Sequence, residues 1–164
     1  MRKIIILLLI CTLLFLSCEK ETKYIPLPGE YTLKCQISDV EYDVKITLDE
    51  ALSGKLAFSP ESEMCDWEFY YSSEDKSIKY FTSLGEVSEA KLAKNENVKY
   101  LFKFVLCDFD NISDVSHNKI SGIDVSVLKT TDGVTVYTDS ASGRPLRIET
   151  ERMTADIISH PQGQ

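Results

Sequence analysis

Cysteine and histidine are the side chains most able to do chemistry, and this chain carries few of them. Its 164 residues include five cysteines and two histidines. Zinc sites need such ligands at short spacings, whereas Cys35, Cys65 and Cys107 lie 30 and 42 residues apart and no C-x-x-C pair occurs. We therefore expect no metal site and no cofactor.

The same three cysteines have structural interpretations. Cys35 and Cys65 lie on the apolar sides of two predicted strands, so they either pack in a core or pair in a disulfide, which an exported protein permits. Cys107 falls opposite the apolar stripe of a predicted helix, where it is unpaired or covered by another element.

Catalytic constellations are missing from the sequence. His117 and His160 each lie in a polar turn or tail, where we expect solvated side chains. There is no G-x-S-x-G, no H-E-x-x-H and no glycine-rich phosphate loop. An acidic cluster lacks the spacing of a calcium loop, so we interpret it as a solvated rim; it consists of Glu61, Glu63, Asp66 and Glu68. We expect no catalytic residues and no enzymatic activity.

Aromatic side chains form the sharper candidate site. Trp67, Phe69 and Tyr80 lie on neighbouring predicted strands, and Phe102 and Phe109 lie on the helix expected to cover them. These rings either fill the core between sheet and helix, or line a cleft for an acyl chain or another apolar ligand.

The elements that position these rings follow from hydrophobic periodicity. Apolar and polar residues alternate in short segments, which is typical of half-buried antiparallel strands. From Val98 to Ile112 the spacing changes to three and one, which predicts an amphipathic helix over 98–110. Residues 86–97 have a thin apolar face and are expected to form a loop. The predicted strands lie near 31–37, 42–48, 54–58, 65–71, 78–81, 123–127, 134–137, 146–148 and 153–158. Eight or nine strands and one helix predict an α+β domain dominated by an antiparallel sheet.

The N-terminus carries an export signal. Residues 4–17 hold twelve apolar residues, two polar residues and no charge, and follow the cationic Arg2 and Lys3. This stretch is shorter than the ~20 residues of a spanning helix. Its end, Leu14-Phe15-Leu16-Ser17-Cys18, resembles a bacterial lipobox, which implies a signal peptide over 1–17 and acylation of Cys18. The alternatives are an ordinary signal peptide cleaved nearby or an uncleaved anchor.

The net charge of the chain excludes some classes of binding partner. Removal of residues 1–17 would take away Arg2 and Lys3. The remaining chain would have 16 basic and 26 acidic residues, and its net charge would be −10 in place of −8. Such an acidic surface argues against nucleic acid and against docking on anionic headgroups. Residues 18–29 contain Cys18, charges, prolines and a glycine, which predicts a lipidated, flexible tether ahead of a domain over 30–160.

The order of these elements along the chain resembles that of a known protein family. The segments that carry it are Leu52–Pro60, Ile78-Lys79-Tyr80, the helix at 98–110, Val136–Asp139 and Gly143-Arg144-Pro145-Leu146-Arg147-Ile148. In this order they look like the small lipoproteins related to LolA and LolB. The resemblance implies an antiparallel sheet curved into an incomplete (half) barrel and covered by helix. It also implies binding of lipids, lipoproteins or other apolar or envelope ligands.

We therefore expect a lipoprotein anchored through Cys18 on the extracytoplasmic face of a bacterial cell membrane, inner or outer. It would bind an apolar or lipid-like ligand in the half-barrel cleft. The alternative is an envelope protein-interaction or scaffold lipoprotein with a filled core and no small ligand.

Overall fold

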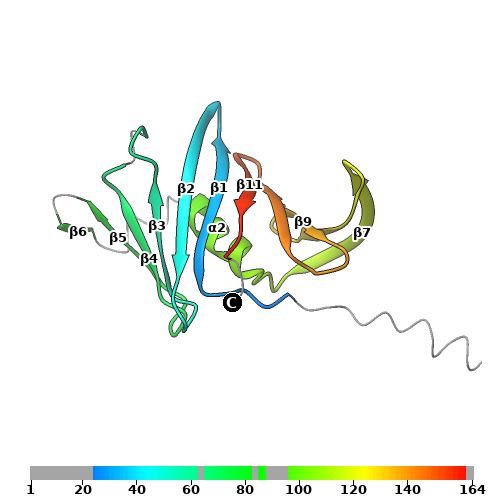
Figure 1. Ribbon diagram of the computed structural model, residues 1–164, viewed down its shortest axis with the longest axis horizontal. Coiled ribbons are helices and arrows are strands. Elements are labelled where there is room, and N and C mark those ends of the chain that lie inside the picture. The colour runs from blue at the N-terminus through cyan, green and yellow to red at the C-terminus, as the bar shows by residue number, and fades with distance from the viewer. Residues whose placement is uncertain (1–23, 63–64, 83–84, 88–95, 162–164) are drawn as a thin grey trace, which may run out of the picture.

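The computed structural model describes residues 24–62, 65–82, 85–87 and 96–161. The expected signal peptide, Cys18 and the first part of the tether lie outside these residues. The described parts form one antiparallel sheet and one helix, α2, and the sheet curves around the helix without closing into a barrel (Figure 1). The expectation of a mostly-β α+β fold is confirmed.

Within the described ranges the sheet has eleven strands, so the expected eight or nine were too few. They run in the order β6-β5-β4-β3-β2-β1-β11-β10-β9-β8-β7, and every neighbouring pair is antiparallel. The bounds are β1 Gly29–Ile37, β2 Val40–Leu48, β3 Gly54–Phe58, β4 Glu68–Tyr71, β5 Ile78–Thr82, β6 Gly85–Val87, β7 Ile112–Ile120, β8 Ile123–Thr130, β9 Thr135–Asp139, β10 Pro145–Glu149 and β11 Met153–Ser159.

Two meanders meet at the centre of the sheet. Strands β1 to β6 follow one another in space as in sequence, and so do β7 to β11. The pairing of β1 with β11 joins the two halves, with Cys35 opposite Ala155 and a register shift between Thr32 and Leu33. Because the two strands are antiparallel, the first residues of β1 lie beside the last residues of β11, with Thr32 opposite Ser159.

Alternating side chains give the sheet one buried face. Tyr31, Leu33 and Cys35 of β1 are fully buried, while Lys34 and Gln36 between and after them are exposed. Gly54 of β3 pairs with Leu48 of β2, and a Cβ atom there would lie 2.6 Å from Leu48 Cδ2, so this close approach requires glycine. Since side chains of one strand point alternately to either face, each central strand contributes every second residue to the core.

Helix α2 spans Glu96–Leu106 and fills the buried side of the sheet. Val98, Leu101, Phe102 and Val105 are buried at the expected spacing, and Phe104 is buried as well. The Phe102 ring stacks on Tyr71 of β4 at 5.3 Å between ring centroids. Tyr100 donates a hydrogen bond from its hydroxyl to Asp132 beyond β8 (3.0 Å), so α2 is tied to both halves of the sheet.

The helix ends earlier than the periodicity predicted. The backbone N–H of Cys107 donates to the Phe104 carbonyl and that of Asp108 donates to the Lys103 carbonyl. This pair of bonds is the Schellman motif, and Cys107 takes its left-handed position with φ 53°. Phe109 and Ile112 therefore lie beyond the helix. Ile112 begins β7, where its side chain is 45% exposed.

Two strands were missed for different reasons. β6 is three residues long and lies where a loop was expected, so it is too short to show a period. β7 is a nine-residue edge strand whose side chains are all exposed, so it has no buried face to impose an apolar alternation.

Two side chains on or near the expected strands lie outside the core between the sheet and α2. Val125 is buried, but Val127 pairs with Tyr137 and Leu128 pairs with the core residue Val136, so Val125 lies on the opposite face. Cys65 lies in an exposed turn before β4 and not on a strand. Cys35, Cys65 and Cys107 are all free thiols in this structure.

Candidate functional site

The predicted aromatic residues lie together, but they pack on one another. Trp67 stacks on Tyr80 at 5.3 Å and on Phe69 at 6.3 Å between ring centroids. Phe69 and Tyr80 are 5.8 Å apart. Phe102 stacks instead on Tyr71, and Phe109 lies after α2, partly buried against the core.

These rings offer little surface to a ligand. Phe69, Phe102 and Tyr80 are exposed by 0%, 1% and 3%, and only Trp67 and Phe109 are half-buried. Because a ligand needs lining surface, the geometry favours the core interpretation for the three buried rings.

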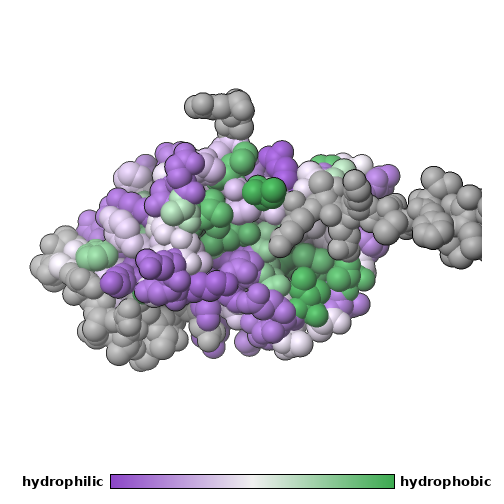
Figure 2. Space-filling view, turned by 90° about the horizontal axis from the view of Figure 1, so that it is seen from below, coloured by the Kyte–Doolittle hydropathy of each residue, from purple (hydrophilic) through white to green (hydrophobic). Residues whose placement is uncertain are grey.

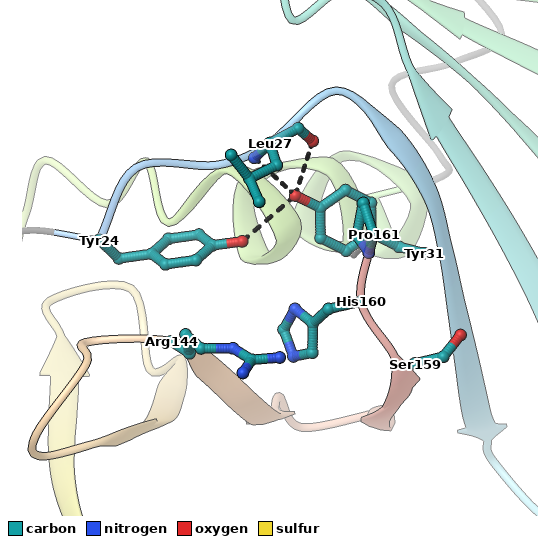
Figure 3. Close-up of a pocket in the computed structure, with 7 residues that line it drawn as sticks. All are labelled: Tyr24, Leu27, Tyr31, Arg144, Ser159, His160 and Pro161. Atoms are coloured by element: carbon teal, nitrogen blue, oxygen red, sulfur yellow. Dashed lines mark hydrogen bonds between the residues drawn. The ribbon is translucent and has the colours of Figure 1, made fainter. Parts of the chain in front are cut away.

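A cleft of about 550 Å³ lies instead where the tether enters the sheet (Figure 3). Its walls come from the segment before β1, the start of β1, the β9–β10 turn and the end of β11. The lining residues are Tyr24, Leu27, Tyr31, Arg144, Ser159, His160 and Pro161.

A tyrosine network fixes one wall. The Tyr31 hydroxyl donates to the Leu27 carbonyl and accepts from the Leu27 N–H, both at 2.9 Å. Since that hydroxyl has one hydrogen, the 3.2 Å bond between the two tyrosine hydroxyls is donated by Tyr24. Burial, together with the bond to Tyr31, raises the pKa of Tyr24. The network holds the tether segment against β1.

His160 and Arg144 form the polar side of the cleft. Burial, with the positive charge of Arg144, lowers the pKa of His160 from 6.5 to about 4, so its imidazole is neutral at pH 7. Its ring lies edge-on to Tyr31 at 5.7 Å, and its Nδ1 is buried without a hydrogen-bond partner among the described residues. The Arg144 guanidinium points toward this imidazole (Figure 3).

Arg144 is an exposed cation that lines the cleft. No carboxylate in the described ranges lies within ion-pair distance of its guanidinium. The nearby Asp139 accepts hydrogen bonds from the Ala141 N–H at 3.0 Å and from the Ser142 N–H at 2.7 Å, within its own turn. A bond from the Ser142 hydroxyl at 2.8 Å, together with these N–H bonds and the positive charge of Arg144, lowers the pKa of Asp139.

Sequence reasoning missed this cleft. It treated His160 as a solvated tail residue, but β11 carries His160 to the base of β1, where it is half-buried. Leu27 was expected to belong to the tether alone, and Arg144 was expected only to start a strand. The G-x-P-L segment was the one sequence feature that drew attention to this position. It placed Arg144 at the start of a strand but gave its positive charge no role.

His117 and the described residues of the predicted acidic cluster do not form a common site with the cleft. His117 lies on the exposed strand β7 and not in a turn, and its Nδ1 lies 3.3 Å from the Ser126 hydroxyl. Glu68 pairs with Lys55 and accepts from Tyr70, Glu61 and Asp66 are exposed, and Glu63 lies outside the described residues. Within the described ranges no group of three histidine, cysteine or acidic side chains could hold a metal ion.

Comparison with known proteins adds no family. A scan against protein-family models finds no match, and a search of curated proteins finds none either. Among the described residues, no helix has the length and apolar character needed to cross a membrane.

Proposed function

We propose that this protein is a lipoprotein, anchored through Cys18 on the extracytoplasmic face of a bacterial membrane, that binds a lipid-like ligand. The observation that carries this proposal is the cleft itself, because its wall is built by the segment that follows the lipobox. Tyr24 comes six residues after Cys18, a reach of at most about 20 Å in an extended chain. An acylated Cys18 would hold the cleft close to the bilayer.

Exposed apolar side chains also occur in the segments that build the cleft. Among the described residues, the large exposed hydrophobic side chains other than Val40 and Tyr70 lie before β1 or on β7, β8 and β11. Figure 2 shows hydrophobic surface on the half that holds β7, β9 and β11. An amphiphile in the cleft could place its apolar part over Leu27, which lines the cleft, or over the exposed Ile25 and Ile158 that adjoin its lining residues in the chain.

The curved, open sheet around one helix supports the resemblance to the LolA and LolB group, and we propose that the sheet is a half-barrel of that kind. The packed aromatic rings argue for one change from the expectation. The ligand binds at the cleft beside the tether, and not between the sheet and α2.

The anchor is tested with a matched pair of cysteine variants. Cys18→Ala is expected to release the protein from membranes or to leave it as a precursor with residues 1–17, whereas Cys11→Ala within the signal peptide leaves anchoring unchanged. Detergent partitioning and incorporation of a palmitate analogue report the result. Unchanged partitioning of Cys18→Ala would contradict lipidation.

The ligand is tested by native mass spectrometry of the protein purified from membranes in a neutral detergent. Added mass of a lipid supports the proposal. Finding none favours the second candidate, an envelope protein-interaction module. That candidate rests on β7, a nine-residue strand with exposed side chains at the edge of the sheet that the described residues form, because such an edge can receive a partner strand.

A further inference from the structure

The polar side of the cleft has a specific chemical character. It holds one cation, Arg144, without an ion-pair partner in the described part of the chain. It also holds a neutral imidazole, His160, whose buried Nδ1 has no hydrogen-bond partner among the described residues. A buried polar atom without a partner costs free energy, which a bound ligand group can recover.

Tyr24 contributes differently. Its hydroxyl hydrogen is already donated to Tyr31, so Tyr24 offers a ligand its ring and no further donor. The Leu27 side chain adds an apolar wall to the cleft. Leu27 is 41% exposed, and Ile158 beside Ser159 is 63% exposed. The polar pair therefore lies next to apolar surface.

We propose that the cleft binds the anionic group of an amphiphile, a phosphate or a carboxylate, with Arg144 as its counter-ion and His160 as a second hydrogen-bonding partner. This rests on the proposed function and names the class of its ligand. Guanidinium groups pair with both oxyanions through charge-assisted hydrogen bonds, and the apolar rim receives the start of the chain.

The acidic body of the protein makes this recognition selective. With 26 acidic residues in the sequence, general attraction of anions to the surface is unfavourable. An anion that binds must therefore depend on a local cation, and its affinity must depend on Arg144 in particular.

The test uses the protein purified from membranes in a neutral maltoside detergent and titrated with dodecyl phosphate by calorimetry. Arg144→Gln is expected to weaken binding at least tenfold. Arg152→Gln, which removes an exposed arginine of the β10–β11 turn, is the matched control and is expected to change affinity less than twofold. Circular dichroism checks that both variants keep their fold.

Inorganic phosphate is the second probe. If it binds with the same dependence on Arg144, the anion site is supported and its ligand comes from free phosphate. If only dodecyl phosphate binds, an amphiphile is supported. Equal dodecyl phosphate affinity in wild type and Arg144→Gln, or no binding at all, overturns the anion site, while lipid retained in native mass spectrometry would still support the proposed function.

Discussion

His160 shows how position changes the chemistry of one residue. In an unfolded chain its imidazole titrates near the ordinary 6.5, whereas in the fold burial and the Arg144 charge lower the pKa to about 4. Below pH 6.5 the unfolded chain therefore binds a proton that the folded protein excludes. Stability linked to His160 is complete above pH 6.5 and decreases as the pH falls toward 4.

His160→Gln should remove this dependence. Urea unfolding at pH 7 and pH 5 is expected to show a larger decrease in the free energy of unfolding for wild type than for His160→Gln. His117→Gln serves as the control and should behave like wild type, because His117 lies on the exposed strand β7. An equal decrease in wild type and His160→Gln would contradict the burial of His160.

Helix α2 ends in a Schellman motif formed by its own last residues and the two that follow it. A left-handed residue closes the Schellman motif, and here a cysteine occupies a position that usually contains glycine. Because a side chain at φ 53° is strained, the helix end is held by its two hydrogen bonds and by the packing of the residues around it.

Substitution at this position separates strain from packing. Cys107→Gly and Cys107→Ala both remove the thiol, but only glycine adopts the left-handed conformation without strain. Chemical denaturation is expected to show Cys107→Gly more stable than Cys107→Ala by about 1 kcal/mol. Equal stabilities would show that Cys107 leaves this conformation in solution.

At the scale of the whole molecule, the packing of α2 against the curved sheet forms the core. Phe102 is 1% exposed and stacks on Tyr71, so its ring links the helix to β4. The β1–β11 pairing completes this core, because it joins strands that are far apart in the chain.

Phe102→Ala tests this packing. Removing a buried phenylalanine ring typically costs about 3–5 kcal/mol, and a loss of that size is expected in the free energy of unfolding. Phe81→Ala is the matched control, since Phe81 is half-buried and packs on the exposed Tyr70, and a smaller loss is expected. An unchanged melting temperature for Phe102→Ala would place α2 elsewhere.

Local patterns in the sequence determined most strands, the helix face and the fold class. The alternations in β1 and β2 and the spacing from Val98 to Val105 are direct consequences of one buried face. They could not predict β7, because an edge strand without a buried face has no period, or the end of α2, because no glycine marks it.

The sequence likewise determined the acidic character, and the proposal of a lipobox at Cys18 rests on residue type and order alone. Only the tertiary structure decided which side chains meet. The pairing of β1 with β11 brings Tyr24, Tyr31 and His160 together across more than 100 residues, and the β9–β10 turn adds Arg144. Such a cleft leaves no periodic trace in the sequence, because each wall contributes a single isolated residue whose role depends on its neighbours in space.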